Sequence, residues 1–81
     1  MPPASLAKLA DMYEDLKRFD LAAQSLEDLG ERFPTGSHDA AWRAAELFDR
    51  KVKDMTSARS AYGRVPTTSS HYREAQKRAQ R

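Results

Sequence analysis

The sequence predicts an all-α protein built from antiparallel helical hairpins. Apolar residues recur at spacings of three and four in five successive segments, which is the pattern of helices that bury one side. The connections between these segments are only a few residues long, so neighbouring helices must run in opposite directions. No segment alternates apolar and polar residues in the way that a half-buried strand does.

Length and composition narrow the possibilities further. The chain has 81 residues, which allows one domain at most, and it has no cysteine, which excludes disulfides and thiolate zinc sites. Its formal net charge of +2 is too weak to indicate nucleic-acid binding by itself. No apolar run is long enough to span a membrane, and residues 1–5 lack the features of a signal peptide. The compartment therefore stays undecided between cytoplasm and periplasm.

The first hairpin is expected from two amphipathic segments. A helix over residues 6–16 would bury Leu6, Leu9, Ala10, Tyr13 and Leu16. Pro2 and Pro3 suit its first turn, where a missing N–H is not needed. A helix over residues 21–33, with Asp20 as its predicted N-cap, ends before Pro34. Its apolar side would consist of Ala22, Ala23, Leu26, Leu29 and Phe33.

Three further helices complete the prediction. The third covers about residues 39–51, with Ser37 as a candidate N-cap. The residues that it points towards a core would be Ala41, Trp42, Ala44, Ala45 and Phe48. A turn at residues 51–54 leads to the fourth helix, over about residues 55–64, which contributes Ala58, Ala61, Tyr62 and Val65. Pro66 closes it, and Ser70 is the predicted cap of a last, basic helix over residues 72–81.

An internal repeat relates the two hairpins. Ala10 and Tyr13 recur after 35 residues as Ala45 and Phe48. The second helices match after 36 residues, through Ala22, Leu26 and Leu29 against Ala58, Tyr62 and Val65. The distance from Ala45 to Ala58 is therefore one residue longer than that from Ala10 to Ala22, and Pro66 comes early.

These residues resemble the signature of the tetratricopeptide repeat family. The residues that carry the resemblance are Leu6, Leu9, Ala10, Tyr13, Ala22, Leu26, Leu29 and Pro34. The resemblance implies helical hairpins stacked in a right-handed superhelix within a single domain, residues 1–81. Repeat one would cover about residues 3–34, repeat two about residues 37–66 and a capping helix about residues 70–81. The segments around Pro34 and Pro66 are similar to divergent repeats of bacterial envelope and outer-membrane assembly proteins, and the chain is expected to be part of a longer protein.

The resemblance also implies a peptide groove along the first helix of each pair. By position, that groove would be lined by Ala7, Asp11, Glu14, Trp42, Glu46 and Asp49. The lysines, asparagine and arginine with which chaperone-binding members hold a terminal carboxylate are missing from these positions. An acidic groove with an aromatic floor would favour a basic or amphipathic peptide. Two alternatives stay open: the carboxylates are simply a solvated helix face, and Trp42 is a core residue.

Other kinds of site are not expected. His38 and His71 lack the spacing of a helical metal-binding pair, and the serines lack the local pattern of a nucleophile, so we predict no metal, cofactor, small-molecule substrate or catalysis. The basic end of the chain could contact phosphates, but helix C-termini favour cations for their own reasons. The residues concerned are Arg73, Lys77, Arg78 and Arg81.

Charge changes sign along the chain. Residues 1–34 carry four basic and seven acidic side chains, whereas residues 67–81 carry four basic and one acidic. Opposite charges at the two ends of a stack would permit head-to-tail self-association. Taken together, the sequence predicts a protein-interaction scaffold, with a structural spacer in a larger envelope or repeat protein as the alternative.

Overall fold

The computed structural model describes residues 2–34 and 38–81, and these residues are helical with no strand. The all-α class is therefore confirmed. Six elements follow one another along the described chain: α1 (Pro3–Asp15), α2 (Phe19–Arg32), α3 (Ala40–Leu47), the π-helical turn η1 (Phe48–Val52), α4 (Met55–Gly63) and α5 (Tyr72–Ala79). None of these helices is long and apolar enough to cross a membrane.

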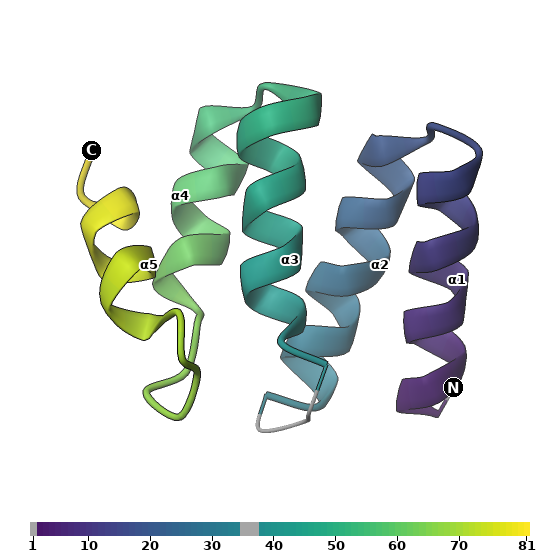
Figure 1. The fold of residues 1–81 in the computed structure, drawn as a ribbon, viewed down its shortest axis with the longest axis horizontal. Helices are drawn as coiled ribbons and strands as arrows, with labels where there is room; N and C mark the ends of the chain where they lie inside the picture. The colour runs from purple at the N-terminus through teal and green to yellow at the C-terminus, as the bar shows by residue number, and fades with distance from the viewer. Residues whose placement is uncertain (1, 35–37) are drawn as a thin grey trace.

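The helices form two layers (Figure 1). Consecutive helices run in opposite directions and pack on each other, and α1, α3 and α5 lie in front of α2 and α4 in this view. The Cα atoms span 30 × 26 × 16 Å. The shortest dimension fits two layers whose axes lie about 8–10 Å apart. Arg43 on α3 bonds to α1, and Arg64 beyond α4 pairs with Glu27 on α2, so ion pairs also join helices of the same layer.

The first hairpin turns at Lys17, whose backbone adopts the left-handed conformation. Pro3 lies in the first turn of α1, as expected. At the other end, Lys17 adopts φ 61°, and the amide of Arg18 donates to the carbonyl of Tyr13 at 2.8 Å, which is a Schellman ending. The prediction that Asp20 caps α2 is wrong. The helix already begins at Phe19, because the Arg18 carbonyl accepts from the Ala22 amide, and Asp20 lies within its first turn.

The second hairpin accommodates its extra residue as a π-helical turn. Lys53, with φ 65°, occupies the place of Lys17, and each lysine precedes its matching alanine, Ala58 or Ala22, by five residues. The added residue must therefore lie before Lys53, where η1 replaces the predicted start of a turn at residues 51–52. A single inserted residue is what converts one turn of an α-helix into a wider π turn.

Of the last two helices, α4 has a side-chain cap and α5 does not. The carboxylate of Asp54 accepts from the amide of Ser57 at 3.1 Å and caps α4. The prediction that Ser70 caps α5 is wrong, since no side chain caps that helix, and the hydroxyl of Ser69 instead accepts from the amide of His71 at 3.1 Å. The predicted cap Ser37 lies outside the described residues.

Small residues dominate the core. The buried set consists of ten alanines together with Leu6, Leu26, Leu29, Trp42, Leu47, Phe48, Tyr62 and Val65. Alanine at so many contacts lets helix backbones approach closely. The expectation that Leu16 and Phe33 belong to this core is wrong: they are 67% and 36% exposed, and each lies one residue beyond the end of its helix.

Candidate interaction surface

Arg43 joins the first and third helices on the outer side of the front layer. One guanidinium nitrogen, Nη2, donates to Asp11 at 2.8 Å and to Glu14 at 3.2 Å. Asp11 and Glu14 are three residues apart and therefore share one side of α1. The Asp11 side chain keeps 62% of its surface exposed, so this cluster faces solvent. The two carboxylates predicted to line a groove are thus partly neutralised by an arginine.

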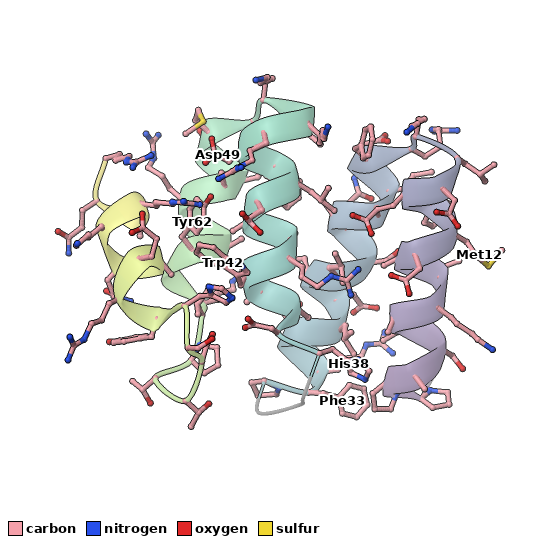
Figure 2. All side chains as sticks on the ribbon, viewed as in Figure 1. Met12, Phe33, His38, Trp42, Asp49 and Tyr62 are labelled. Atoms are coloured by element: carbon pink, nitrogen blue, oxygen red, sulfur yellow. The ribbon has the colours of Figure 1, made fainter. Side chains whose placement is uncertain are left out.

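Trp42 lies at the junction of α3, α4 and α5 (Figure 2). Its ring is only 7% exposed. The imidazole of His71 stacks on it with centroids 4.3 Å apart and planes within 3°, and the ring of Tyr62 lies 5.5 Å away. The guanidinium of Arg78 lies 4.9 Å from the indole centroid, which is a cation–π distance. Trp42 therefore holds α5 against α3 and α4.

A chain of hydrogen bonds surrounds this ring. Arg78 donates to the Tyr62 hydroxyl at 3.0 Å and to Glu74 at 3.0 Å, and the Tyr62 hydroxyl donates to Asp49 at 2.9 Å. Burial raises the pKa of the Tyr62 phenol, Arg78 opposes that rise and Asp49 adds to it. The hydrogen bond to Tyr62 in turn raises the pKa of Arg78. These groups therefore keep their neutral-pH charge states, with the phenol protonated and the guanidinium charged.

Glu46 makes further ion pairs on α3, next to those of Arg43. Its carboxylate lies 3.7 Å from Arg50 and 3.9 Å from Arg78. Together with the Arg43 cluster, three carboxylates face three guanidinium groups along α1, α3, η1 and α5. This charged row consists of Asp11, Glu14, Arg43, Glu46, Arg50 and Arg78.

The six predicted groove residues separate into three groups. Asp11, Glu14 and Glu46 belong to the charged row. Ala7 and Trp42 do not line a surface, because their exposed fractions are 8% and 7% and both are part of the core. Asp49 is half-buried against Tyr62. The structure thus decides that Trp42 is a core residue, and it pairs the three carboxylates of the row with arginines.

Arg43 and Arg78 are not among the groove residues that the sequence predicts. The sequence places Arg78 in a basic helix end, although it follows Trp42 by 36 residues, the same interval that relates the second helices of the hairpins. That interval could have indicated that Arg78 lies on the neighbouring element. No comparable local signal marks Arg43, which is 32 residues from Asp11.

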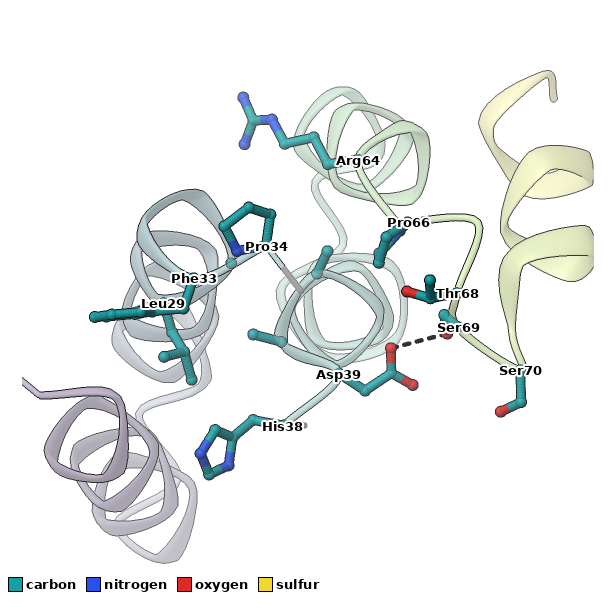
Figure 3. A pocket seen from close by; sticks show the side chains of 13 residues that line it. Leu29, Phe33, Pro34, His38, Asp39, Arg64, Pro66, Thr68, Ser69 and Ser70 are labelled. Carbon is teal, nitrogen blue, oxygen red and sulfur yellow. Dashed lines mark hydrogen bonds between the residues drawn. The ribbon is translucent and has the colours of Figure 1, made fainter. Parts of the chain in front are cut away.

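A hollow of about 250 Å³ lies where α3 begins and the connection from α4 to α5 passes (Figure 3). One of its polar residues is Asp39, which accepts from the Ser69 hydroxyl at 2.9 Å and lies 3.6 Å from Nε2 of His71. Aspartate stands between serine and histidine, whereas a nucleophilic triad requires histidine beside the serine. These contacts instead join the starts of α3 and α5.

The outer side of α1 carries the two most exposed large apolar side chains of the described residues. Met12 is 59% exposed and Leu16 is 67% exposed. Figure 2 shows Met12 pointing away from all other helices. Beside it, a hollow of about 370 Å³ runs between α1 and α2 and is walled on the α1 side by Leu6, Leu9 and Tyr13.

The described residues contain no group of three potential metal ligands. Comparison of the chain with protein-family models, curated proteins and solved structures gave no significant match. Functional inference therefore depends on the chain's own geometry.

Proposed function

We propose that this chain is a tetratricopeptide-like protein-interaction module that binds a peptide segment of another protein without catalysis. The observation that carries the proposal is the charged row, which extends over the front layer formed by α1, α3 and α5. The repeat spacing of the two hairpins and their antiparallel packing support the family assignment. Stacked hairpins with a right-handed superhelical path are part of this proposal.

The row suits a ligand that carries charges along its length. Asp11 and Arg50 have side chains that are more than half exposed, so both signs are accessible. Exposed ion pairs of this kind each stabilise a fold by about 0–1 kcal/mol, so exchanging them for ligand contacts costs little. A basic or amphipathic peptide would compete with Arg43 for Asp11 and Glu14.

An NMR titration with basic amphipathic peptides tests the proposal. We expect amide shifts at Asp11, Glu14 and Glu46, with smaller shifts at Trp42, which contacts the row through Arg78. Arg43→Gln should raise the affinity for a basic peptide about threefold to tenfold, because it frees two carboxylates. Asp11→Asn should lower it. Unchanged spectra along the row, with any of these peptides, would contradict a binding role for this face.

Glu31→Gln is the matched control. Glu31 is similarly exposed and also pairs with an arginine, Arg64, but it lies on α2 in the other layer. The change in charge is the same as in Asp11→Asn, so it separates local contacts from a general electrostatic effect. Binding to the row requires that Glu31→Gln leaves the affinity unchanged.

A structural spacer within a larger protein is the alternative, and the exposed apolar side of α1 favours it. A spacer would assemble through its outer helices and bind no peptide along the row. Retention of peptides by the immobilised chain separates the two functions.

A further inference from the structure

The outer side of α1 carries a short apolar stripe of the kind that pairs helices. Leu9, Met12 and Leu16 are spaced by three and then four residues, which is the spacing of a helix–helix seam. Met12 and Leu16 have most of their surface exposed, and Leu9 also lines the hollow between α1 and α2. The stripe is thus available to a second helix along two turns.

Two charged side chains beside this stripe have no ion-pair partner within the described residues. Within the described residues, every acidic and basic side chain of α1 and α2 has an ion-pair partner except Lys8 and Asp15. These two are seven residues apart and therefore flank the same edge of the stripe, one near each end. The edge is positive at one end and negative at the other.

Two copies of this edge are complementary in charge when they run in opposite directions. In an antiparallel helix pair, each edge meets the same edge of the other helix in the opposite direction, so Lys8 of one copy would face Asp15 of the other, twice. In a parallel pair, this edge would meet the opposite edge, which carries Leu6 and Tyr13 and no charge. The pattern therefore selects a two-fold, antiparallel arrangement.

We infer that the outer face of α1 is a self-association surface that pairs with α1 of a second copy in antiparallel orientation. Apolar contacts of Leu9, Met12 and Leu16 form its centre, and two Lys8–Asp15 pairs form its edge. The inference goes beyond the proposed function, because the surface is centred on Leu9, Met12 and Leu16, none of which belongs to the charged row that would receive a peptide. The outer face of α5 fits less well as the partner of α1, since its most exposed residues are polar: Arg73, Lys77, Gln80 and Arg81.

The association should be weak. A surface centred on one helix of 13 residues, about 20 Å long, is smaller than the interfaces of about 1,200–2,000 Å² that stable complexes bury. We therefore expect a dissociation constant between about 10 μM and 1 mM. Sedimentation equilibrium from about 10 μM to 2 mM covers this range. A protein that stays monomeric throughout would overturn the inference.

Charge reversal provides the specific test. Lys8→Asp places a carboxylate opposite Asp15 of the other copy, at both edges, and should raise the dissociation constant about threefold to tenfold at low salt. Asp15→Lys should do the same. The double variant with both changes restores two opposite pairs and should restore the association. Loss in both single variants without recovery in the double variant would overturn the antiparallel arrangement.

Two controls separate this contact from other causes. The melting temperature of each monomer variant is measured alongside. Asp15→Lys adds a favourable charge in the last turn of α1, and Lys8→Asp changes an exposed position in the middle of the helix, so each should lower the melting temperature by no more than about 4 °C. Lys77→Asp makes the same charge change on α5 and should leave the association unchanged. If Lys77→Asp weakens the association and Lys8→Asp does not, the contact is head-to-tail and the inference is wrong. Met12→Lys should raise the dissociation constant about tenfold or more.

Discussion

The two outer helices of the molecule, α1 and α5, differ in what they leave exposed. Each has a neighbouring helix on one side only (Figure 1). On α5 the aromatic and cationic anchors point inward to Trp42, and the outward residues are polar. On α1, Leu6 and Ala10 point inward, but Met12 and Leu16 remain on the outside. The outer side of α5 is therefore polar, whereas the outer side of α1 is partly apolar.

This difference separates two uses of large apolar side chains. Trp42 is almost fully buried and joins three elements, so its main role is stability. Met12 and Leu16 gain little from the fold of a single copy, because folding removes only part of their surface from water. Exposed apolar residues that gather on one helix side are typical of contact surfaces, and this feature supports the self-association that we infer for α1.

Truncating Trp42 should produce the largest effect and the sharpest contrast between the ends. Trp42→Ala removes a buried aromatic ring and its contacts to His71 and Arg78, so we expect a loss of about 3–5 kcal/mol in the free energy of unfolding. Met12→Ala should cost less than about 0.5 kcal/mol in the monomer. Urea denaturation followed by circular dichroism measures both. Equal losses in the two variants would remove the distinction between the ends.

Replacing Arg78 tests how α5 is held. Arg78→Met keeps most of the side-chain length but removes the hydrogen bonds to Tyr62 and Glu74 and the cation–π contact with Trp42. We expect a loss of about 1–2 kcal/mol, with faster amide hydrogen exchange in α5 than in α1. Lys77→Met, one residue earlier and exposed, is the control and should change stability by less than about 0.5 kcal/mol. Uniform acceleration of exchange in all helices would contradict a local anchor.

Tyr62→Phe should cost about 1 kcal/mol, because Asp49 and Arg78 each lose a hydrogen-bond partner. The phenol also makes stability depend on pH at the alkaline side. Its pKa is raised in the folded protein, so the stability associated with the protonated phenol is complete below the ordinary value of about 10. That stability is lost as the pH rises through the folded pKa. The difference in free energy of unfolding between wild type and Tyr62→Phe should therefore shrink above about pH 10. A constant difference would contradict the shift.

Glycine substitutions at the two lysines with a left-handed backbone should give the smallest changes in the free energy of unfolding, and the two changes should be equal. Lys17 and Lys53 end the first helix of their hairpins at φ 61° and 65°, where glycine is favoured. Lys17→Gly and Lys53→Gly should each raise the free energy of unfolding by about 0.5–1 kcal/mol, since the relief of strain exceeds the extra entropy of the unfolded chain. Thermal denaturation measures both. Stabilisation at one site only would show that the hairpin turns are not equivalent, despite the similar φ angles of the two lysines.

Much of the fold could be predicted because local patterns encode it. The spacing of apolar residues indicated every helix, and Pro34 and Pro66 indicated where the second helix of each pair ends. Boundaries were less predictable. Asp20 and Ser70 resemble caps locally, but α2 begins at Phe19, directly after Arg18, and the Ser69 hydroxyl accepts from the His71 amide before α5. The candidate surface was predicted only in part. Asp11, Glu14 and Glu46 were placed on one face, whereas their arginine partners were not.

The sequence by itself determined the all-α class, the order of the helices, the two hairpins and the extra residue between Ala45 and Ala58. Each of these depends on interactions within a few turns of one helix. Only the tertiary structure decided that Trp42 is buried while Met12 is exposed, and that Arg43 and Arg78 pair with the carboxylates of the row. The reason is that an apolar pattern shows which sides of a helix are apolar, but it does not show which of these sides another helix covers. Burial depends on which neighbouring helix lies against each side, and long-range packing sets that arrangement.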